Sequence, residues 1–154
     1  MIIRKYLSED LVFMIELFKG TVHEINKQDY SQEQLNTWAP EFIDKEKWKK
    51  RFDDYITYVA VDYLGNIIGF ANISSAGYLD MLYVHKDHQG EGIGSKLVQE
   101  LEAQAIFKKA NIIETDASIT ARTFFEKHGY RVEKEQKVIR NGVEFINYKM
   151  KKRI

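Results

Sequence analysis

The chain contains the glycine-rich stretch Gln89-Gly90-Glu91-Gly92-Ile93-Gly94-Ser95, which follows a predicted strand and opens a predicted helix. Glycines at alternate positions let the backbone turn tightly, with few side chains between its N–H groups and a ligand. Those donors and the positive end of the helix dipole suit a phosphate or pyrophosphate. An ordinary flexible turn is the alternative, and both interpretations stay open because short glycine motifs also occur by chance.

The stretch differs from two well-known phosphate-binding loops. A P-loop places Lys and then Ser or Thr after its second glycine, whereas here Ser95 precedes Lys96, so that interpretation fails. The dinucleotide-binding fingerprint G-x-G-x-x-G fits poorly, because the third glycine comes one residue early. A strand meander before the stretch also disagrees with the doubly wound parallel sheet of dinucleotide-binding domains.

Outward from this stretch, hydrophobic periodicity predicts an α/β domain with a mixed sheet, in the order β-α-α-β-β-β-α-β-α-β-β. Helices are predicted after candidate caps at Ser8, Ser31 and Asp44, after the glycine-rich stretch, and over 118–127. Short turns make an antiparallel meander of the central strands, and a helical crossover makes the next strand parallel to them. The predicted strands cover 2–6, 56–63, 67–74, 78–84, 112–116, 130–139 and 143–150.

The composition excludes several classes of function. The 154 residues include 23 Lys plus Arg and 23 Asp plus Glu, so no excess of positive charge favours nucleic acid or anionic lipid. The absence of cysteine excludes disulfides, thiolate metal sites and a cysteine nucleophile. No apolar run approaches the roughly 20 residues of a membrane span. We therefore expect one domain over residues 1–154, in the cytoplasm, with neither nucleic acid nor membrane as a partner.

Two motifs and the order of elements resemble the GNAT family of N-acetyltransferases. Gln89-x-x-Gly92-x-Gly94 is similar to the acetyl-CoA pyrophosphate signature of that family, and the strand over 79–84 stands where its fourth strand does. The later segment Ala121-Arg122-Thr123-Phe124-Phe125-Glu126-Lys127-His128-Gly129-Tyr130 resembles a second family motif. The order of elements agrees over essentially the whole chain.

This resemblance implies a GNAT-like acyl-CoA N-acyltransferase fold that binds acetyl-CoA between two splayed strands. The pantetheine arm would bond to the backbone of the first of these strands, and one of its N–H groups would stabilise the oxyanion. Backbone amides of the glycine-rich stretch would hold the pyrophosphate, and Lys96 would add positive charge. Ser118 would replace an asparagine that binds the pantetheine arm in many family members. The implied cofactor-binding residues are Leu82, Tyr83, Val84, Gln89, Gly90, Glu91, Gly92, Ile93, Gly94, Ser95, Lys96, Ser118 and Phe125.

One departure from the family pattern concerns the proton donor. The family tyrosine that protonates the departing CoA thiolate maps to Phe125, which has no proton to give. A thiol of pKa about 8–9 leaves fairly well as the thiolate, so this loss slows the step rather than forbidding it. We expect Phe125 to pack beside the thioester sulfur, while Tyr83, Tyr130 or a water molecule supplies the proton.

The attacking amine must be neutral, so a base or a water relay is expected. Asp80 shares strand parity with Leu82 and Val84 and is the candidate base, with a solvated or hydrogen-bonded carboxylate as the alternative. The early helices resemble those of a bacterial GNAT subgroup whose acceptors are mostly unassigned. Candidate acceptor-binding residues there are His23, Tyr30 and Trp38, with a half-exposed helix histidine and core aromatic residues as the alternatives.

The leading interpretation is an acetyl-CoA-dependent N-acetyltransferase that acts by direct transfer in a ternary complex, on an amine of a small molecule or a protein. The alternative is a non-catalytic acyl-CoA-binding or sensing module, which Phe125 favours. His85-x-x-His88 supplies only two ligands, so no metal is expected. The resemblance also allows a homodimer, because the last two strands often meet a partner in this family.

Overall fold

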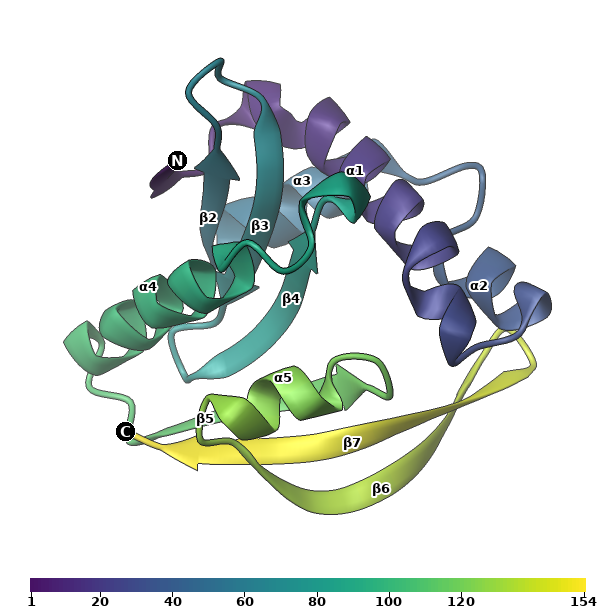
Figure 1. Ribbon diagram of the computed structural model, residues 1–154. Helices are drawn as coiled ribbons and strands as arrows, with labels where there is room; N and C mark the ends of the chain where they lie inside the picture. Colours follow the sequence, from purple (N-terminus) through teal and green to yellow (C-terminus); the bar gives the residue numbers. More distant parts are fainter.

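The computed structural model describes residues 1–154 and contains a seven-stranded mixed sheet in the order β1-β2-β3-β4-β5-β7-β6 (Figure 1). Its strands are β1 Ile2–Lys5, β2 Ile56–Val61, β3 Ile67–Ile73, β4 Tyr78–Val84, β5 Ile112–Ser118, β6 Arg131–Arg140 and β7 Val143–Arg153. Its helices are α1 Leu11–Glu24, α2 Gln32–Trp38, α3 Lys45–Asp54, α4 Ile93–Phe107 and α5 Arg122–Lys127. The predicted mixed α/β class is confirmed, and the helices expected after Ser8, Ser31 and Asp44 all lie between β1 and β2, which is one more than the predicted order of elements counted there. None of these helices is both long and apolar enough to cross a membrane.

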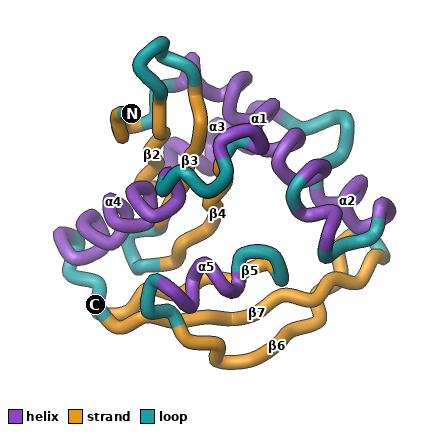
Figure 2. Tube along the Cα trace, viewed as in Figure 1, coloured by secondary structure: helices purple, strands orange, loops and turns teal.

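Helices cover both faces of the sheet (Figures 1 and 2). On one face, α1, α2 and α3 bury Phe18, Leu35 and Phe52 in one apolar cluster, against β2, β3 and β4. On the other face, α4 and α5 bury Leu97 and Phe125 in a second cluster. Because both sides are covered, β3 is nearly all apolar instead of alternating, as buried strands are.

The helix starts follow local capping chemistry, with one correction. Ser31 and Gln34 form the expected capping box at α2, and Asp44 accepts hydrogen bonds from the first turn of α3. The cap expected at Ser8 is wrong, because Ser8 lies in a short 3-10 turn and α1 begins at Leu11. There the carboxylate of Asp10 accepts a hydrogen bond from the backbone N–H three residues earlier.

The last third of the chain forms a long hairpin behind a short helix. The helix expected from residue 118 begins only at Arg122, because Ser118 ends β5 and its Oγ accepts the N–H of Ala121. The hairpin expected at Asn141-Gly142 is confirmed, and both residues adopt the positive φ angles of a type I′ turn, 49° and 77°.

The sheet opens between β4 and β5. These strands are parallel, as expected, but pair only at Tyr78 with Glu114 and at Leu79 with Thr115. Beyond these pairs β4 turns away from β5, and Figure 1 shows the two strands diverging. The β3–β4 register also shifts by one residue at Asp80, which is a β-bulge. The remaining five residues of β4 therefore have no strand partner on their β5 side.

Candidate active site

Two cavities meet at the opening between β4 and β5. The smaller, of about 210 Å³, lies among β4, β5, α5 and the start of α4. The larger, of about 450 Å³, lies among α1, α3, β4 and the β6–β7 hairpin. One set of residues lines both: Trp38, Asp80, Met81, Tyr83, Asp116 and Ser118. Two ligands could therefore meet across β4, each from its own cavity.

The backbone of β4 presents free hydrogen-bonding groups to this opening. The N–H of His85 donates to the carbonyl of Ile68 on β3, and in an antiparallel pair only every second residue faces its partner strand. The N–H groups of Leu82 and Val84 consequently point away from β3, towards the gap left by β5. They can bond an extended ligand as a neighbouring strand would, or hold an oxyanion.

The bulge in β4 corrects the expected side-chain parity of Asp80. Leu82 and Val84 pack against the cluster beneath α4, whereas the extra residue turns Asp80 towards α3. There the carboxylate of Asp80, only 3% exposed, forms two hydrogen bonds with the guanidinium of Arg51. Burial lowers the pKa of Arg51, but the bonds to Asp80 outweigh this effect and raise it overall. Both carboxylate oxygens of Asp80 are thus already engaged in hydrogen bonds, so the geometry does not support its proposed role as the base.

A buried amide fixes the bulge in place. The Asn72 side chain is fully buried, donates from Nδ2 to the Asp80 carboxylate at 3.1 Å and accepts the N–H of Met81 at 2.8 Å. It therefore supplies the partner that the bulged backbone would otherwise lack. Sequence reasoning missed Asn72 and Arg51, although a lone amide within the apolar strand Ile67–Ile73 was a usable signal.

We expect Asn72→Ala to lower the free energy of unfolding by about 2 kcal/mol, because a buried N–H and a carboxylate each lose a partner. Chemical denaturation measures the change. Asn66→Ala is the matched control, since it removes an exposed amide that bonds only to Asp62, and it should cost less than about 0.5 kcal/mol. Equal losses in the two variants would contradict a role of Asn72 in holding the bulge.

The hydroxyl of Tyr83 lies where the two cavities meet. Its oxygen accepts a hydrogen bond from Trp38 Nε1 at 3.1 Å, and its own proton has no protein acceptor. Burial raises the pKa of Tyr83 to about 12, although the bond from Trp38 and the charge of Arg140 act against this. The phenol is therefore protonated at neutral pH and free to donate into the cavity.

The glycine-rich stretch forms an open anion cradle at the start of α4. Gly90 and Gly92 have φ angles of 75° and 82°, which side chains other than glycine rarely adopt. No protein atom accepts a hydrogen bond from the backbone amides between Gln89 and Ser95. Together with the helix dipole they suit a pyrophosphate, and Lys96 is exposed in the first turn of α4.

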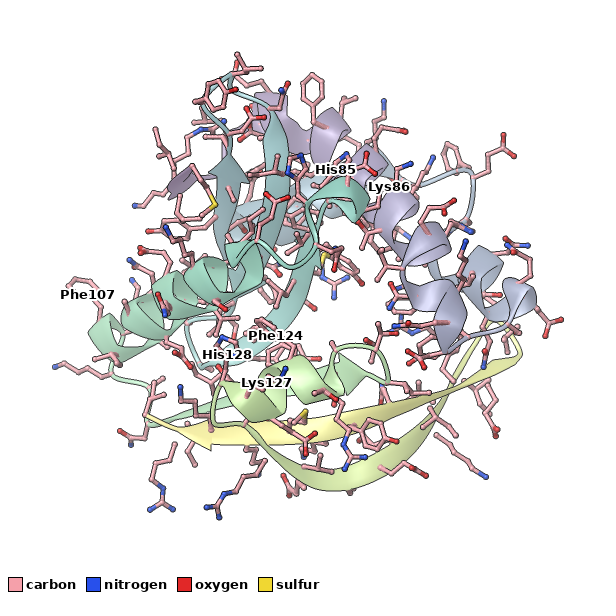
Figure 3. The ribbon with its side chains drawn as sticks, viewed as in Figure 1. His85, Lys86, Phe107, Phe124, Lys127 and His128 are labelled. Carbon is pink, nitrogen blue, oxygen red and sulfur yellow. The ribbon has the colours of Figure 1, made fainter.

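A histidine that sequence reasoning missed holds this cradle against α5. His128 Nε2 bonds to Ser95 Oγ at 2.9 Å, Nδ1 bonds to the carbonyl of Phe124 at 2.8 Å, and the ring stacks on Phe124. Figure 3 shows Phe124 and His128 reaching from α5 towards α4. A Cβ on Gly94 would lie 3.1 Å from the Phe124 ring, so glycine permits this close packing.

The other predicted residues fall into two groups. Phe125 lines the smaller cavity and Tyr30 the larger one, while Ser118 and Trp38 line both. The Tyr30 hydroxyl is fully used, since it donates to the carbonyl of Ile146 and accepts the N–H of Ile119, so only its ring can contact a ligand.

Two of the predicted catalytic and acceptor-binding residues lie outside both cavities. The Tyr130 hydroxyl is buried and donates to the carboxylate of Glu102, and burial raises the pKa of Tyr130. His23 Nε2 bonds to the carbonyl of Ala39 at 2.8 Å. The geometry therefore does not support a catalytic role for Tyr130 or an acceptor-binding role for His23. His85 and His88 lie side by side, but no group of three or more metal-binding side chains occurs in the structure.

Comparisons with known proteins agree with this geometry. Residues 26–152 match the model of the acetyltransferase (GNAT) domain. The uncharacterized N-acetyltransferase YafP of Escherichia coli K12 is 32% identical over 149 residues, which cover 97% of this chain and 93% of YafP. A crystal structure of a GCN5-related N-acetyltransferase from Rhodopseudomonas palustris superposes with a TM-score of 0.95, at 34% identity, over 99% of this chain and 95% of that one.

The fold is also shared with the PaiA N-acetyltransferase of Thermoplasma acidophilum, solved in complex with coenzyme A. That structure has a TM-score of 0.82 at 23% identity and covers 99% of this chain and 98% of its own. The chain belongs to the GNAT family of acetyltransferases. It is an acetyl-CoA-dependent N-acetyltransferase, and none of the relatives described here favours the alternative of a non-catalytic acyl-CoA-binding module.

Proposed function

We propose that this enzyme transfers the acetyl group directly from acetyl-CoA to an amine, in a ternary complex assembled across β4. The observation that supports this most is the meeting of the two cavities at Tyr83, Asp80 and Ser118. One cavity holds the thioester and the other holds the acceptor, so the amine reaches the carbonyl carbon without a covalent enzyme intermediate. The absence of cysteine agrees with direct attack.

Acetyl-CoA lies in the smaller cavity. The pyrophosphate binds the amides from Gln89 to Ser95, and the pantetheine arm lies along β4 as an additional strand. Amide carbonyl groups of the arm accept hydrogen bonds from the free backbone N–H groups of Leu82 and Val84. As the amine attacks, one of these groups stabilises the oxyanion, because it is already oriented before the charge develops. Phe125 packs beside the sulfur.

Two side chains that line both cavities act in the reaction: Tyr83 donates a proton and Asp116 binds the ammonium. When the C–N bond forms and the C–S bond breaks, the Tyr83 hydroxyl protonates the departing thiolate and is itself reprotonated by solvent. The ammonium of the incoming acceptor docks near Asp116, whose carboxylate accepts bonds from Tyr78 and Gln136 but has no cationic partner. The ammonium loses one proton to water to become the neutral nucleophile, and the nitrogen loses a second to water once the C–N bond has formed, since Asp80 is paired with Arg51.

Release of free CoA from acetyl-CoA tests this proposal. Because the chain has no cysteine, a thiol reagent reports CoA alone, without background from the protein. We expect thiol release that depends on both an added amine and the enzyme, with no burst when acetyl-CoA is added alone. Tight binding of acetyl-CoA without turnover of any amine would reject catalysis, and a burst without an amine would reject direct transfer.

A cytoplasmic location, a single domain over 1–154 and a homodimer complete the proposal. These three points come from composition and family resemblance, and they remain predictions. The identity of the acceptor depends on the larger cavity, whose side chains come from seven different helices and strands.

A further inference from the structure

The larger cavity has an unusual distribution of charge. Four charged side chains line it: Arg51, Asp80, Asp116 and Arg140. Arg51 and Asp80 neutralise each other through two hydrogen bonds. Asp116 has no cationic partner, and Arg140 forms neither an ion pair nor a side-chain hydrogen bond. The larger cavity therefore offers one unpaired negative group and one unpaired positive group to a ligand.

The two free charges lie at different depths along the same sheet. Asp116 is bonded to Gln136, at the point where the two cavities meet. Gln136, Val138 and Arg140 alternate along β6 on one face and all line the larger cavity. Arg140 lies four positions beyond Gln136, which is roughly 13 Å along β6. Arg140 therefore lies further along β6 than Gln136, next to the turn at Asn141, and its charge still acts on Tyr83.

Between these ends the wall is mainly aromatic. Phe18, Trp48, Tyr30 and Phe145 line the larger cavity along with Val138, and none of them brings a charge. Such a wall accommodates an apolar or aromatic body and leaves recognition to the few polar groups at its ends.

We infer that the acceptor is an amine that also carries an anionic group, most simply a carboxylate, several bonds away from its nitrogen. This inference rests on the proposed function. The ammonium docks near Asp116 beside the thioester, the body of the acceptor contacts the aromatic wall, and the carboxylate pairs with the guanidinium of Arg140. Short peptides and amino acids with a long spacer between amine and carboxylate have this chemistry, whereas a polyamine would place a second cation against Arg140.

Matched acceptor pairs that differ only in the carboxylate test the inference. Suitable pairs are L-phenylalanine with 2-phenylethylamine, 6-aminohexanoate with hexylamine, and glycyl-L-phenylalanine with glycine 2-phenylethylamide. In at least one of the last two pairs, which have the longer spacer, we expect the acceptor with the carboxylate to have a kcat/KM about tenfold or more above that of the acceptor without it. The charge-assisted contact with Arg140 is the reason. In Arg140→Gln this ratio should fall towards one, and in Arg140→Lys it should be intermediate, because lysine cannot form the bidentate contact.

Lys137→Gln is the matched control, since it removes a cation from the same strand on the opposite face. The ratio should be unchanged in this variant. Equal kcat/KM within every pair, a ratio retained in Arg140→Gln, or a preference for spermidine over every acid would overturn the inference.

Binding separates this inference from the proposed function. The same pairs are titrated calorimetrically into the protein saturated with CoA. A carboxylate preference that disappears in Arg140→Gln supports the inference even if no amine is turned over, in which case the proposed catalysis fails. Binding without any such preference overturns the inference even if turnover is observed.

Discussion

Tyr83→Phe is expected to lower kcat by about 100-fold or more, because it removes the proton donor to the CoA thiolate. The affinity for acetyl-CoA should change little, since the ring and its packing on Phe18 and Phe70 are retained. The pKa of about 12 also predicts that the wild-type rate shows no alkaline loss from this group up to about pH 10. Steady-state kinetics across pH, together with titration of CoA, measure both effects.

A second substitution, at Phe125, is expected to restore activity to the Tyr83→Phe variant. The side chain lines the thioester cavity, where we expect it to pack beside the sulfur, so Phe125→Tyr places a phenol near the same leaving group. The double variant Tyr83→Phe/Phe125→Tyr should regain a substantial part of the lost kcat if the role of Tyr83 is protonation. A kcat that Tyr83→Phe leaves unchanged would contradict that role. Loss without rescue, accompanied by lower thermal stability, would make Tyr83 a packing residue instead.

Gly92→Asp is expected to weaken CoA binding by about 100-fold or more. A residue other than glycine at a φ of 82° is strained by roughly 1–2 kcal/mol, and the new carboxylate repels the pyrophosphate from the cradle. A Cβ at this position meets no atom within 4 Å, so steric clash does not contribute. Calorimetric titration with CoA, repeated at high salt to screen the repulsion, measures the loss and its electrostatic share.

Gly65→Asp is the matched control for this experiment. Gly65 has a φ of 87°, lies in the β2–β3 turn, and also has no atom within 4 Å of an added Cβ. The same substitution should therefore lower stability by a similar amount without changing the affinity for CoA. Unchanged affinity in Gly92→Asp, or an equal loss in both variants, would contradict the anion cradle.

Much of the fold could be predicted because its determinants are local. The capping box of Ser31 and Gln34, the Asn141-Gly142 turn and the periodicity of α4 each specify their own element. The errors arise where a neighbouring group competes. Ser8 does not cap α1, since the Asp10 carboxylate occupies that turn, and Ser118 joins β5 because its strand pairing continues to that residue.

The site was less predictable, because its decisive groups come from elements far apart in the chain. The bulge at Asp80 needs an amide from β3 and a guanidinium from α3, so the parity expected for a regular strand did not apply. In the sequence, nothing distinguishes Arg140 from other charged residues beside a turn. In the structure, the β6–β7 hairpin places it in the lining of the larger cavity. Only the tertiary arrangement distinguishes it from Lys137, which carries the same charge on the other face.

The two cavities meet at β4 but are otherwise lined by different residues, and this bears on how the enzyme responds to its own product. Once the thiol has formed, spent CoA and the acetylated amine occupy different cavities, so one product can leave before the other. A fresh amine can then enter while spent CoA is still bound, which creates an abortive complex that cannot react. The ratio of acetyl-CoA to CoA in the surroundings, and not the concentration of acetyl-CoA alone, would then set the fraction of the enzyme that is in a reactive complex.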